Sequence, residues 1–154
     1  MKVLFLLHST MQSGATISFM NMVEGIIPTG VEPVIVHPKN DNEIFQAFLD
    51  KHNIKSYVVD LQMSVYPTLS KNVKLYWIRW IKSFVAYWIK EFLATKKLDK
   101  IVRIEKPAII HTNTGVVRTG IKVALNNNTP HILHLREYQD KDFGWSILPN
   151  KDAF

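Results

Sequence analysis

The sequence predicts an α/β protein in which helices cover both faces of a mostly parallel sheet. Short apolar runs of strand length alternate with longer segments whose apolar residues recur at helical spacing. The first unit is the clearest, because the apolar run Val3–Leu7 leads through a polar loop to Ser13, Gly14, Ala15 and Thr16, which are turn and helix-capping residues. Strand, loop and helix repeated in this order form βαβ units, and the strands of such units run parallel.

The elements follow one another regularly along the chain. Short strands rich in β-branched and aromatic residues are expected at 3–7, 34–36, 57–59, 108–110 and 131–135. Helical patterns cover about 14–27, 42–49, 71–97, 98–106 and 117–125. Pro28 with Gly30 ends the first helix, and Pro107 ends the fourth. The predicted fold is therefore a Rossmann-like domain of three layers.

Length and composition restrict the classes of protein. The 154 residues are 47% hydrophobic and 21% charged, which fits one globular domain with a core. There is no cysteine, and the six histidines do not pair at zinc-binding spacing, so we expect neither a metal nor a cofactor. The N-terminal apolar run is shorter than the roughly 7–15 residues of a signal peptide. No stretch reaches the roughly 20 apolar residues of a membrane span, so a cytoplasmic location is expected.

Positive charge is concentrated in one region. The net charge is +6, and residues 71–106 hold ten basic and three acidic residues, so this segment carries +7 and the remainder about −1. On a helical wheel, residues 71–93 place a broad aromatic and apolar arc opposite Arg79, Lys82 and Lys90. Such a helix suits either core packing or an anionic membrane surface, where tryptophan lies at headgroup depth. Because the aromatic residues lie opposite the charges, a nucleic-acid groove is not expected. The residues predicted to contact a membrane are Lys74, Trp77, Trp80, Lys82, Phe84 and Trp88.

Candidate site residues follow the predicted strands. Open α/β sheets bind ligands at the carboxyl ends of their strands, where this sequence places His8–Ser13, His37, Asp60, His111–Thr114 and His134–Glu137. Helix-start amides after the first strand are able to meet a phosphate. His134 and Arg136 share one strand face, and Arg136 offers a planar fork for a carboxylate or phosphate. Each group also has a structural interpretation, as a helix cap or as a strand-end residue with a local partner. The expected cleft residues are Ser13, Gly14, Ala15, Thr16, His111, Asn113 and Thr114, and the expected catalytic residues are His134, Arg136 and Glu137.

Together these segments resemble the N-terminal half of a GT-B glycosyltransferase, of the family-4 type found in bacterial polysaccharide synthesis. The first strand Lys2–His8 is followed by Ser13–Ala15, where that family often has Gly-Gly-Ala. Residues 104–113 are similar to the family's lysine-proline-aspartate-isoleucine-valine-histidine stretch. The third matching segment is Thr129–Tyr138.

The resemblance implies a Rossmann-like acceptor-side domain over residues 1–145, with 146–154 beginning the segment toward a donor-binding C-terminal domain that this chain lacks. It implies that Ser13 and Gly14 approach the donor phosphates or the transferred sugar. The strand end at His134, Arg136 and Glu137 is where the family places cleft residues, often a His-Asp pair, whereas this sequence has Arg-Glu in the nearest register.

The implied partners are a nucleotide-sugar donor, held mostly by the missing domain, and a glycan or lipid-linked acceptor. The full-length protein is then expected to be a hexosyltransferase of polysaccharide or capsule synthesis, peripheral on the inner face of the cytoplasmic membrane, and the fragment inactive. The alternative is a non-catalytic Rossmann-like module that binds a nucleotide or phosphosugar. A nicotinamide dehydrogenase is disfavoured, because the glycine fingerprint is absent and His37-Pro38-Lys39 follows the second strand instead of an acidic residue.

Overall fold

A computed structural model describes residues 1–39, 42–65 and 76–136, without the side chains of Tyr76 and Trp77. The described residues form a five-stranded parallel sheet of order β3-β2-β1-β4-β5. Leu4 at the centre of the sheet pairs with Val34 on one side and with Ile110 on the other. The predicted parallel α/β sheet is confirmed. Its strands are β1 (Lys2–Leu6), β2 (Glu32–His37), β3 (Lys55–Val58), β4 (Ile109–Thr112) and β5 (His131–Leu133).

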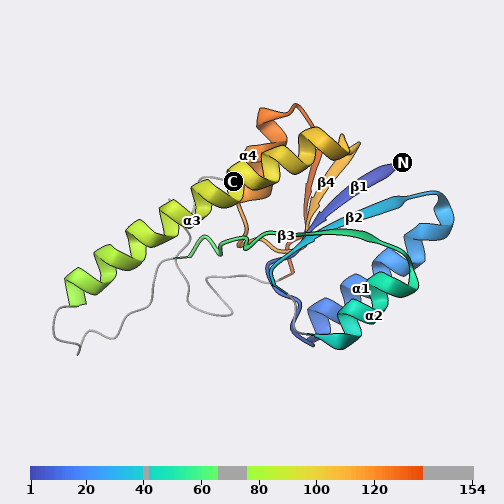
Figure 1. Ribbon diagram of the computed structural model, residues 1–154, viewed down its shortest axis with the longest axis horizontal. Helices are drawn as coiled ribbons and strands as arrows, with labels where there is room; N and C mark the ends of the chain where they lie inside the picture. The colour runs from blue at the N-terminus through green and yellow to red at the C-terminus, as the bar shows by residue number, and fades with distance from the viewer. Residues whose placement is uncertain (40–41, 66–75, 137–154) are drawn as a thin grey trace.

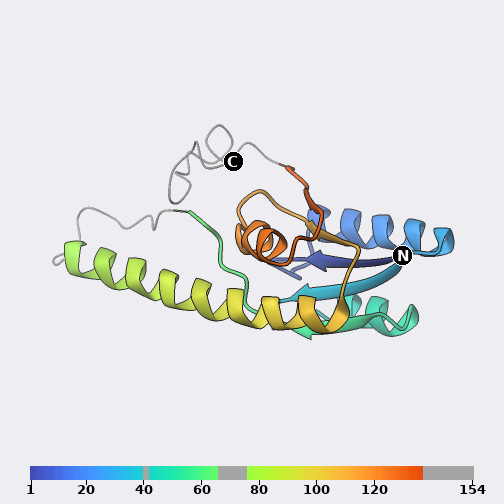
Figure 2. The ribbon, with the colours of Figure 1, turned by 90° about the horizontal axis from the view of Figure 1, so that it is seen from above.

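Helices cover both faces of the sheet, as Figures 1 and 2 show. The helices are α1 (Gly14–Ile26), α2 (Glu43–Lys51), α3 (Tyr76–Glu105) and α4 (Thr119–Asn126). Successive strand residues point to opposite faces, so Phe5 packs in a core cluster with residues of α1 and α2. Leu4 and Leu6 belong to a second cluster with residues of α3 and α4. The sheet therefore separates two apolar cores.

Local capping explains where the first helices begin and end. Ser13 is extended, and its hydroxyl accepts a hydrogen bond from the Thr16 amide at the start of α1. A short 3₁₀ turn, η1 (Ile27–Thr29), follows α1 and contains the predicted Pro28. Gly30 closes it at φ +84°, a left-handed conformation that glycine adopts without strain. At α2, the Asn42 side chain accepts from the amides of Ile44 and Phe45.

The sequence predicts two helices, over 71–97 and 98–106, but the described residues form a single continuous helix, α3 (Tyr76–Glu105); residues 71–75 lie outside the described residues. The prediction of a break near residue 98 is wrong, because no proline or glycine interrupts the segment. Ala94, Leu98 and Ile101 are buried at spacings of three and four residues, which keeps one face on the core across the predicted break. The helix ends at Glu105, followed by Lys106 at φ +46° and then by Pro107.

The last helix begins later than predicted. The pattern after Gly115, from Val117 to Leu125, indicated one helix, but α4 starts at Thr119, and Val117 is buried in the preceding loop. Gly120 then lies against the sheet: a Cβ there would meet the Thr112 hydroxyl oxygen at 2.3 Å. This close approach requires glycine and brings the loop after β4 over the strand ends.

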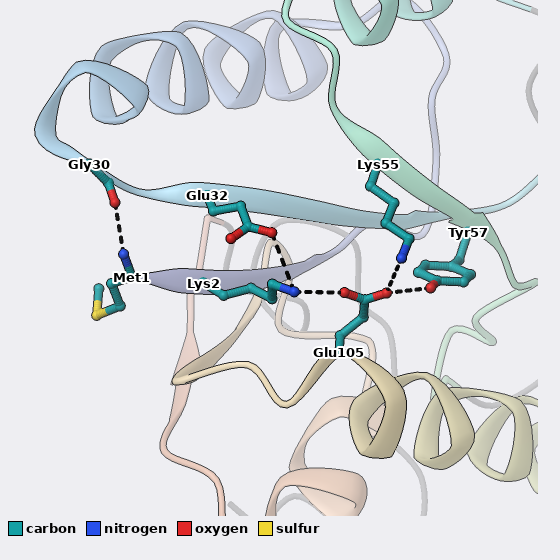
Figure 3. A network of polar contacts seen from close by, with 7 residues as sticks. All are labelled: Met1, Lys2, Gly30, Glu32, Lys55, Tyr57 and Glu105. Carbon is teal, nitrogen blue, oxygen red and sulfur yellow. Dashed lines mark hydrogen bonds and ion pairs between the residues drawn. The ribbon is translucent and has the colours of Figure 1, made fainter.

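A buried carboxylate joins the elements at the amino edge of the sheet (Figure 3). The Glu105 side chain is only 3% exposed and forms ion pairs with Lys2 at 3.0 Å and Lys55 at 2.6 Å. The Tyr57 hydroxyl also donates to this carboxylate. These bonds, with the Lys55 contribution first, lower the pKa of Glu105 to about 2. This edge lies opposite the carboxyl ends of the strands and is a structural junction.

Candidate functional site

A cavity of about 440 Å³ lies at the carboxyl ends of β1 and β4. One wall is the loop after β1 with the first turn of α1, and the facing wall is the loop after β4 together with Arg136. Met63 contributes from the segment after β3. This is the edge at which parallel α/β sheets bind ligands. The lining residues are Leu7, His8, Ser9, Met11, Gln12, Ser13, Gly14, Ala15, Thr16, Met63, Asn113, Thr114, Val116 and Arg136.

The loop after β1 is held by its own polar groups. The Thr16 hydroxyl donates to the Met11 carbonyl at 2.7 Å and lies 3.2 Å from the Ser13 hydroxyl. The Asn42 side-chain amide donates to the Thr10 carbonyl at 2.7 Å, which ties the loop to the start of α2. The first turn of α1 therefore lies fixed at the cavity wall, and its amides carry the partial positive charge of a helix N-terminus.

Asn113 and Arg136 meet on the facing wall. The Arg136 guanidinium donates to the Asn113 amide oxygen through Nε at 3.2 Å and through Nη2 at 2.8 Å. Asn113 and Thr114 are both buried, and the Asn113 backbone amide donates to the Leu6 carbonyl at 3.0 Å. The central strand β1 thus positions Asn113, and Asn113 orients Arg136. The Arg136 guanidinium is a delocalised cation at the cavity.

A group of histidines lies beside this wall. The rings of His111 and His134 are edge to face with centroids 5.8 Å apart. Burial, with the neighbouring His134 second, lowers the pKa of His111 to about 4. Burial and the nearby Arg136 lower the pKa of His134, and burial lowers that of His131, whose Nε2 lies 2.9 Å from the Thr112 hydroxyl. These shifts favour neutral imidazoles near pH 7.

The structure brings together most of the predicted cleft residues. Six of the seven line the cavity, and Arg136 lies there with them: the six are Ser13, Gly14, Ala15, Thr16, Asn113 and Thr114. The remaining cleft residue, His111, packs between Phe5 and His134 outside the lining, and His134 is also not a lining residue. Glu137 lies outside the described residues. Catalytic roles for His134, Arg136 and Glu137 stay predictions.

Other lining residues escaped the sequence analysis. His37, the last residue of β2, and Asp60, which follows β3, are not among the lining residues, and His37 packs against Phe45. Met63 and Val116 do line the cavity, and they meet because the Ser64 amide donates to the Val116 carbonyl at 2.7 Å. No local pattern marks Met63, since its place depends on a contact between segments that are far apart in the sequence.

The described aromatic residues predicted to contact a membrane form one row along α3, because Phe84 contacts Trp80 on one side and Trp88 on the other, the latter edge to face with centroids 6.1 Å apart. Lys74 and the side chain of Trp77 lie outside the described residues. Trp80 and Phe84 are half-buried and stack on one another with centroids 5.2 Å apart. Lys82 and Trp88 are exposed. Among the described residues, no helix is both long enough and apolar enough to cross a bilayer.

The geometry suits an anionic or polyhydroxylated ligand. The α1 N-terminus, the hydroxyls at Ser13 and Thr114 and the Arg136 guanidinium border one cavity, and such groups bind phosphates and sugar hydroxyls. Within the described part of the chain, no three histidine or carboxylate side chains gather to hold a metal ion.

Comparison with solved structures identifies the architecture: the structural neighbours include GT-B glycosyltransferases, and this chain has the fold of one part of such a protein. No protein-family model and no curated protein matches the sequence.

MurG of Acinetobacter baumannii superposes with a TM-score of 0.59 at 16% identity, over 87% of this chain and 34% of MurG. SsfS6 of Streptomyces sp. SF2575 superposes with a TM-score of 0.54 at 14% identity, over 86% of this chain and 38% of SsfS6. The spinosyn rhamnosyltransferase SpnG, solved with thymidine diphosphate, gives 0.54 at 9% identity, over 87% of this chain and 34% of its own. The chain therefore spans about a third of the length of these enzymes.

Proposed function

We propose that this chain is the acceptor-side half of a glycosyltransferase that moves a sugar from a nucleotide-sugar donor to a glycan or lipid-linked acceptor. The observation that carries the proposal is the cavity where the α1 N-terminus faces Asn113 and Arg136. The GT-B architecture of the structural neighbours supports a sugar-transfer role at the level of the fold. A second, donor-binding Rossmann-like domain completes the cleft in this proposal.

The lining residues take distinct parts in this reaction. The α1 N-terminus beside Ser13 and Gly14 meets the phosphates of the donor or the transferred sugar. Arg136, held by Asn113, orients an anionic or hydroxylated group by paired hydrogen bonds. His134 is not a lining residue but lies beside this wall; burial and Arg136 lower its pKa, so its imidazole is neutral near pH 7 and able to accept a proton from an acceptor hydroxyl that reaches it.

The wider setting follows from the same proposal. The reaction would be a hexosyl transfer in bacterial polysaccharide or capsule synthesis, with the protein peripheral on the inner face of the cytoplasmic membrane. The basic, apolar α3 supports a lipid-linked acceptor, because it offers both kinds of contact that a lipid surface needs.

Replacement of Arg136 tests the transferase proposal in the complete enzyme, with its donor-binding domain. We expect Arg136→Gln to lower kcat/KM for sugar transfer by about tenfold to a hundredfold, since a charge-assisted hydrogen bond contributes about 1.5–3 kcal/mol. The matched control is Lys51→Gln at the end of α2, which removes a cation that pairs with Glu24 of α1, away from the cavity. Equal activities of the two variants, both folded, would contradict the proposal.

The α1 N-terminus at the cavity also favours a second candidate, a non-catalytic module that binds a nucleotide or phosphosugar. Calorimetric titration of this chain with UDP and with TDP separates the two. The module predicts measurable affinity that Gly14→Val abolishes, and nothing outside its chain neighbours and the backbone of its own helix lies within 4 Å of a Cβ at this position. The transferase half predicts weak or absent binding, because the donor pocket belongs mostly to the other domain.

A further inference from the structure

The side of α3 that faces away from the sheet carries a row of exposed apolar side chains. These residues recur at spacings of three and four, so they lie within an arc of about 100° on the helix. Each is between 39% and 60% exposed. We call this row the outer stripe, and its members are Ile78, Ile81, Val85, Trp88, Ile89 and Phe92.

The outer stripe is not the core-packing side of the helix. Ala94, Leu98 and Val102 are buried against the sheet and α4, and on the helical wheel their side lies roughly 140° from the stripe. The N-terminal half of α3, which carries the stripe, extends beyond the sheet in both views (Figures 1 and 2). A contiguous apolar surface of this kind usually marks a contact with another molecule or with a membrane.

Positive charge lies along one edge of the outer stripe. Lys82 flanks the stripe, and Lys96 and Lys100 continue this side of the helix toward the C-terminus, whereas Arg79 and Lys90 lie farther round the helix; all five are exposed. Two of the acidic residues of α3, Glu91 and Glu105, are buried. The third, Asp99, is paired with Arg103 at 2.8 Å. The exposed surface of the helix is therefore apolar and cationic.

We propose that the outer stripe lies in the interface of an anionic bilayer, with the flanking lysines on lipid phosphates. The pattern matches the needs of an interfacial helix, which buries an apolar face at the level of the headgroups and adds electrostatic attraction. A second copy of this chain is a poorer occupant, because pairing two stripes brings two cationic surfaces together. This inference rests on the proposed function, which includes a lipid-linked acceptor. It adds the side of α3 that contacts the membrane.

The outer stripe is not the side of α3 that the aromatic residues predicted from sequence to contact a membrane. Trp80 and Phe84 lie on the same side of the helix as buried Leu98 and are half-buried themselves. Of the residues predicted from sequence, Trp88 belongs to the outer stripe and Lys82 flanks it.

Co-sedimentation of the chain with vesicles tests the proposal. The probes are vesicles of phosphatidylcholine alone and vesicles in which part of that lipid is replaced by phosphatidylglycerol. We expect binding to the anionic vesicles that weakens with added salt. The triple variant Ile81→Ser, Val85→Ser, Ile89→Ser is expected to lower the partition coefficient more than about tenfold. The double variant Lys96→Gln, Lys100→Gln is expected to weaken the preference for anionic lipid, with Lys82 still present.

The control replaces two exposed apolar residues outside α3, Ile44→Ser with Leu125→Ser, and should bind like the unmodified chain. Circular dichroism checks that each variant is folded, and the lysine variant tests the proposal even if the serine variant unfolds. Equal binding to neutral and anionic vesicles, or binding unchanged by the serine variant, would overturn the proposal. Dimers that form in the absence of lipid, depend on concentration and are abolished by the serine variant would also overturn it.

None of these results bears on sugar transfer to a lipid-free acceptor. The membrane proposal and the transferase proposal can therefore fail separately.

Discussion

Two buried carboxylates, Glu91 and Glu105, point from α3 toward the rest of the domain, but their partners differ. Glu105 binds Lys2 and Lys55, which open strands β1 and β3. Glu91 accepts hydrogen bonds from Thr119, the first residue of α4, and from Lys122 at 3.3 Å. A buried charge is tolerated only when such partners replace water. Each carboxylate therefore fixes α3 to a different part of the domain.

The Glu105 junction makes stability depend on pH. Its pKa is lowered from 4.5 to about 2 in the folded protein, so its contribution is complete above about pH 4.5 and is lost as the pH falls toward 2. We expect Glu105→Gln to lower the free energy of unfolding near pH 7 by about 2–3 kcal/mol. Urea denaturation at a series of pH values measures both quantities, and the variant should show a shallower loss below pH 4.5.

Glu32 provides the control for this prediction. It pairs with the same Lys2 at 3.3 Å, but its side chain is 65% exposed. Exposed ion pairs contribute little, so Glu32→Gln should leave the denaturation midpoint almost unchanged. Equal effects of the two substitutions would show that burial of Glu105 does not determine its contribution.

At the level of elements, α3 is bonded to the segment after β3, which lines the cavity, and to the start of α4, which follows the β4 loop that also lines it. The Tyr87 hydroxyl donates to the Ser64 hydroxyl at 2.8 Å, next to Met63 in the lining. One turn later in α3, the Glu91 carboxylate accepts a hydrogen bond from the Thr119 hydroxyl. Thr119 begins α4, directly after the loop that carries Asn113 and Thr114. The long helix α3 therefore carries the outer stripe and also holds two segments that line the cavity, the second through the start of α4.

Removal of the Thr119 hydroxyl tests this connection. We expect Thr119→Val to lower the free energy of unfolding by about 1.5–3 kcal/mol, because it removes a hydrogen bond to a buried carboxylate and keeps the side-chain shape. Denaturant titration measures the change. Thr95→Val is the control, since its hydroxyl bonds only the Glu91 carbonyl within the helix, and a shift within about 0.5 kcal/mol is expected. A Thr119 variant as stable as this control would disprove the connection.

Across the whole molecule, stability should vary along α3. The C-terminal half packs Ala94, Leu98 and Ile101 into the core between the sheet and α4, whereas the described part of the N-terminal half extends past the sheet. Local opening is easiest where few apolar contacts are buried.

Hydrogen exchange followed by mass spectrometry measures this gradient. We expect amides of residues 78–90 to exchange faster than those of 94–105, and to become protected when anionic vesicles are added. Comparison with neutral vesicles shows whether the protection follows the charge of the lipid. Uniform exchange along α3 would contradict the proposed gradient in local stability.

Much of the fold could be predicted because its signals are local. Val3–Leu7 and Val34–Val36 are short apolar runs, and Ser13 and Asn42 cap the helices that follow strands, so neighbours in sequence determine each element. The carboxyl edge of a parallel sheet is likewise implied by strand order along the chain. For that reason Ser13, Asn113 and Arg136 could be predicted to approach one another before their contacts were known.

The sequence by itself determined the alternation of strands and helices, the edge at which polar residues collect, and the concentration of positive charge in residues 71–106. Only the tertiary structure decided that Met63 enters the cavity, that His111 packs outside it, and which side of α3 meets the core. The physical reason is that burial depends on the packing of segments distant in sequence. A helix with apolar residues on two sides carries no local signal to show which side the core will cover.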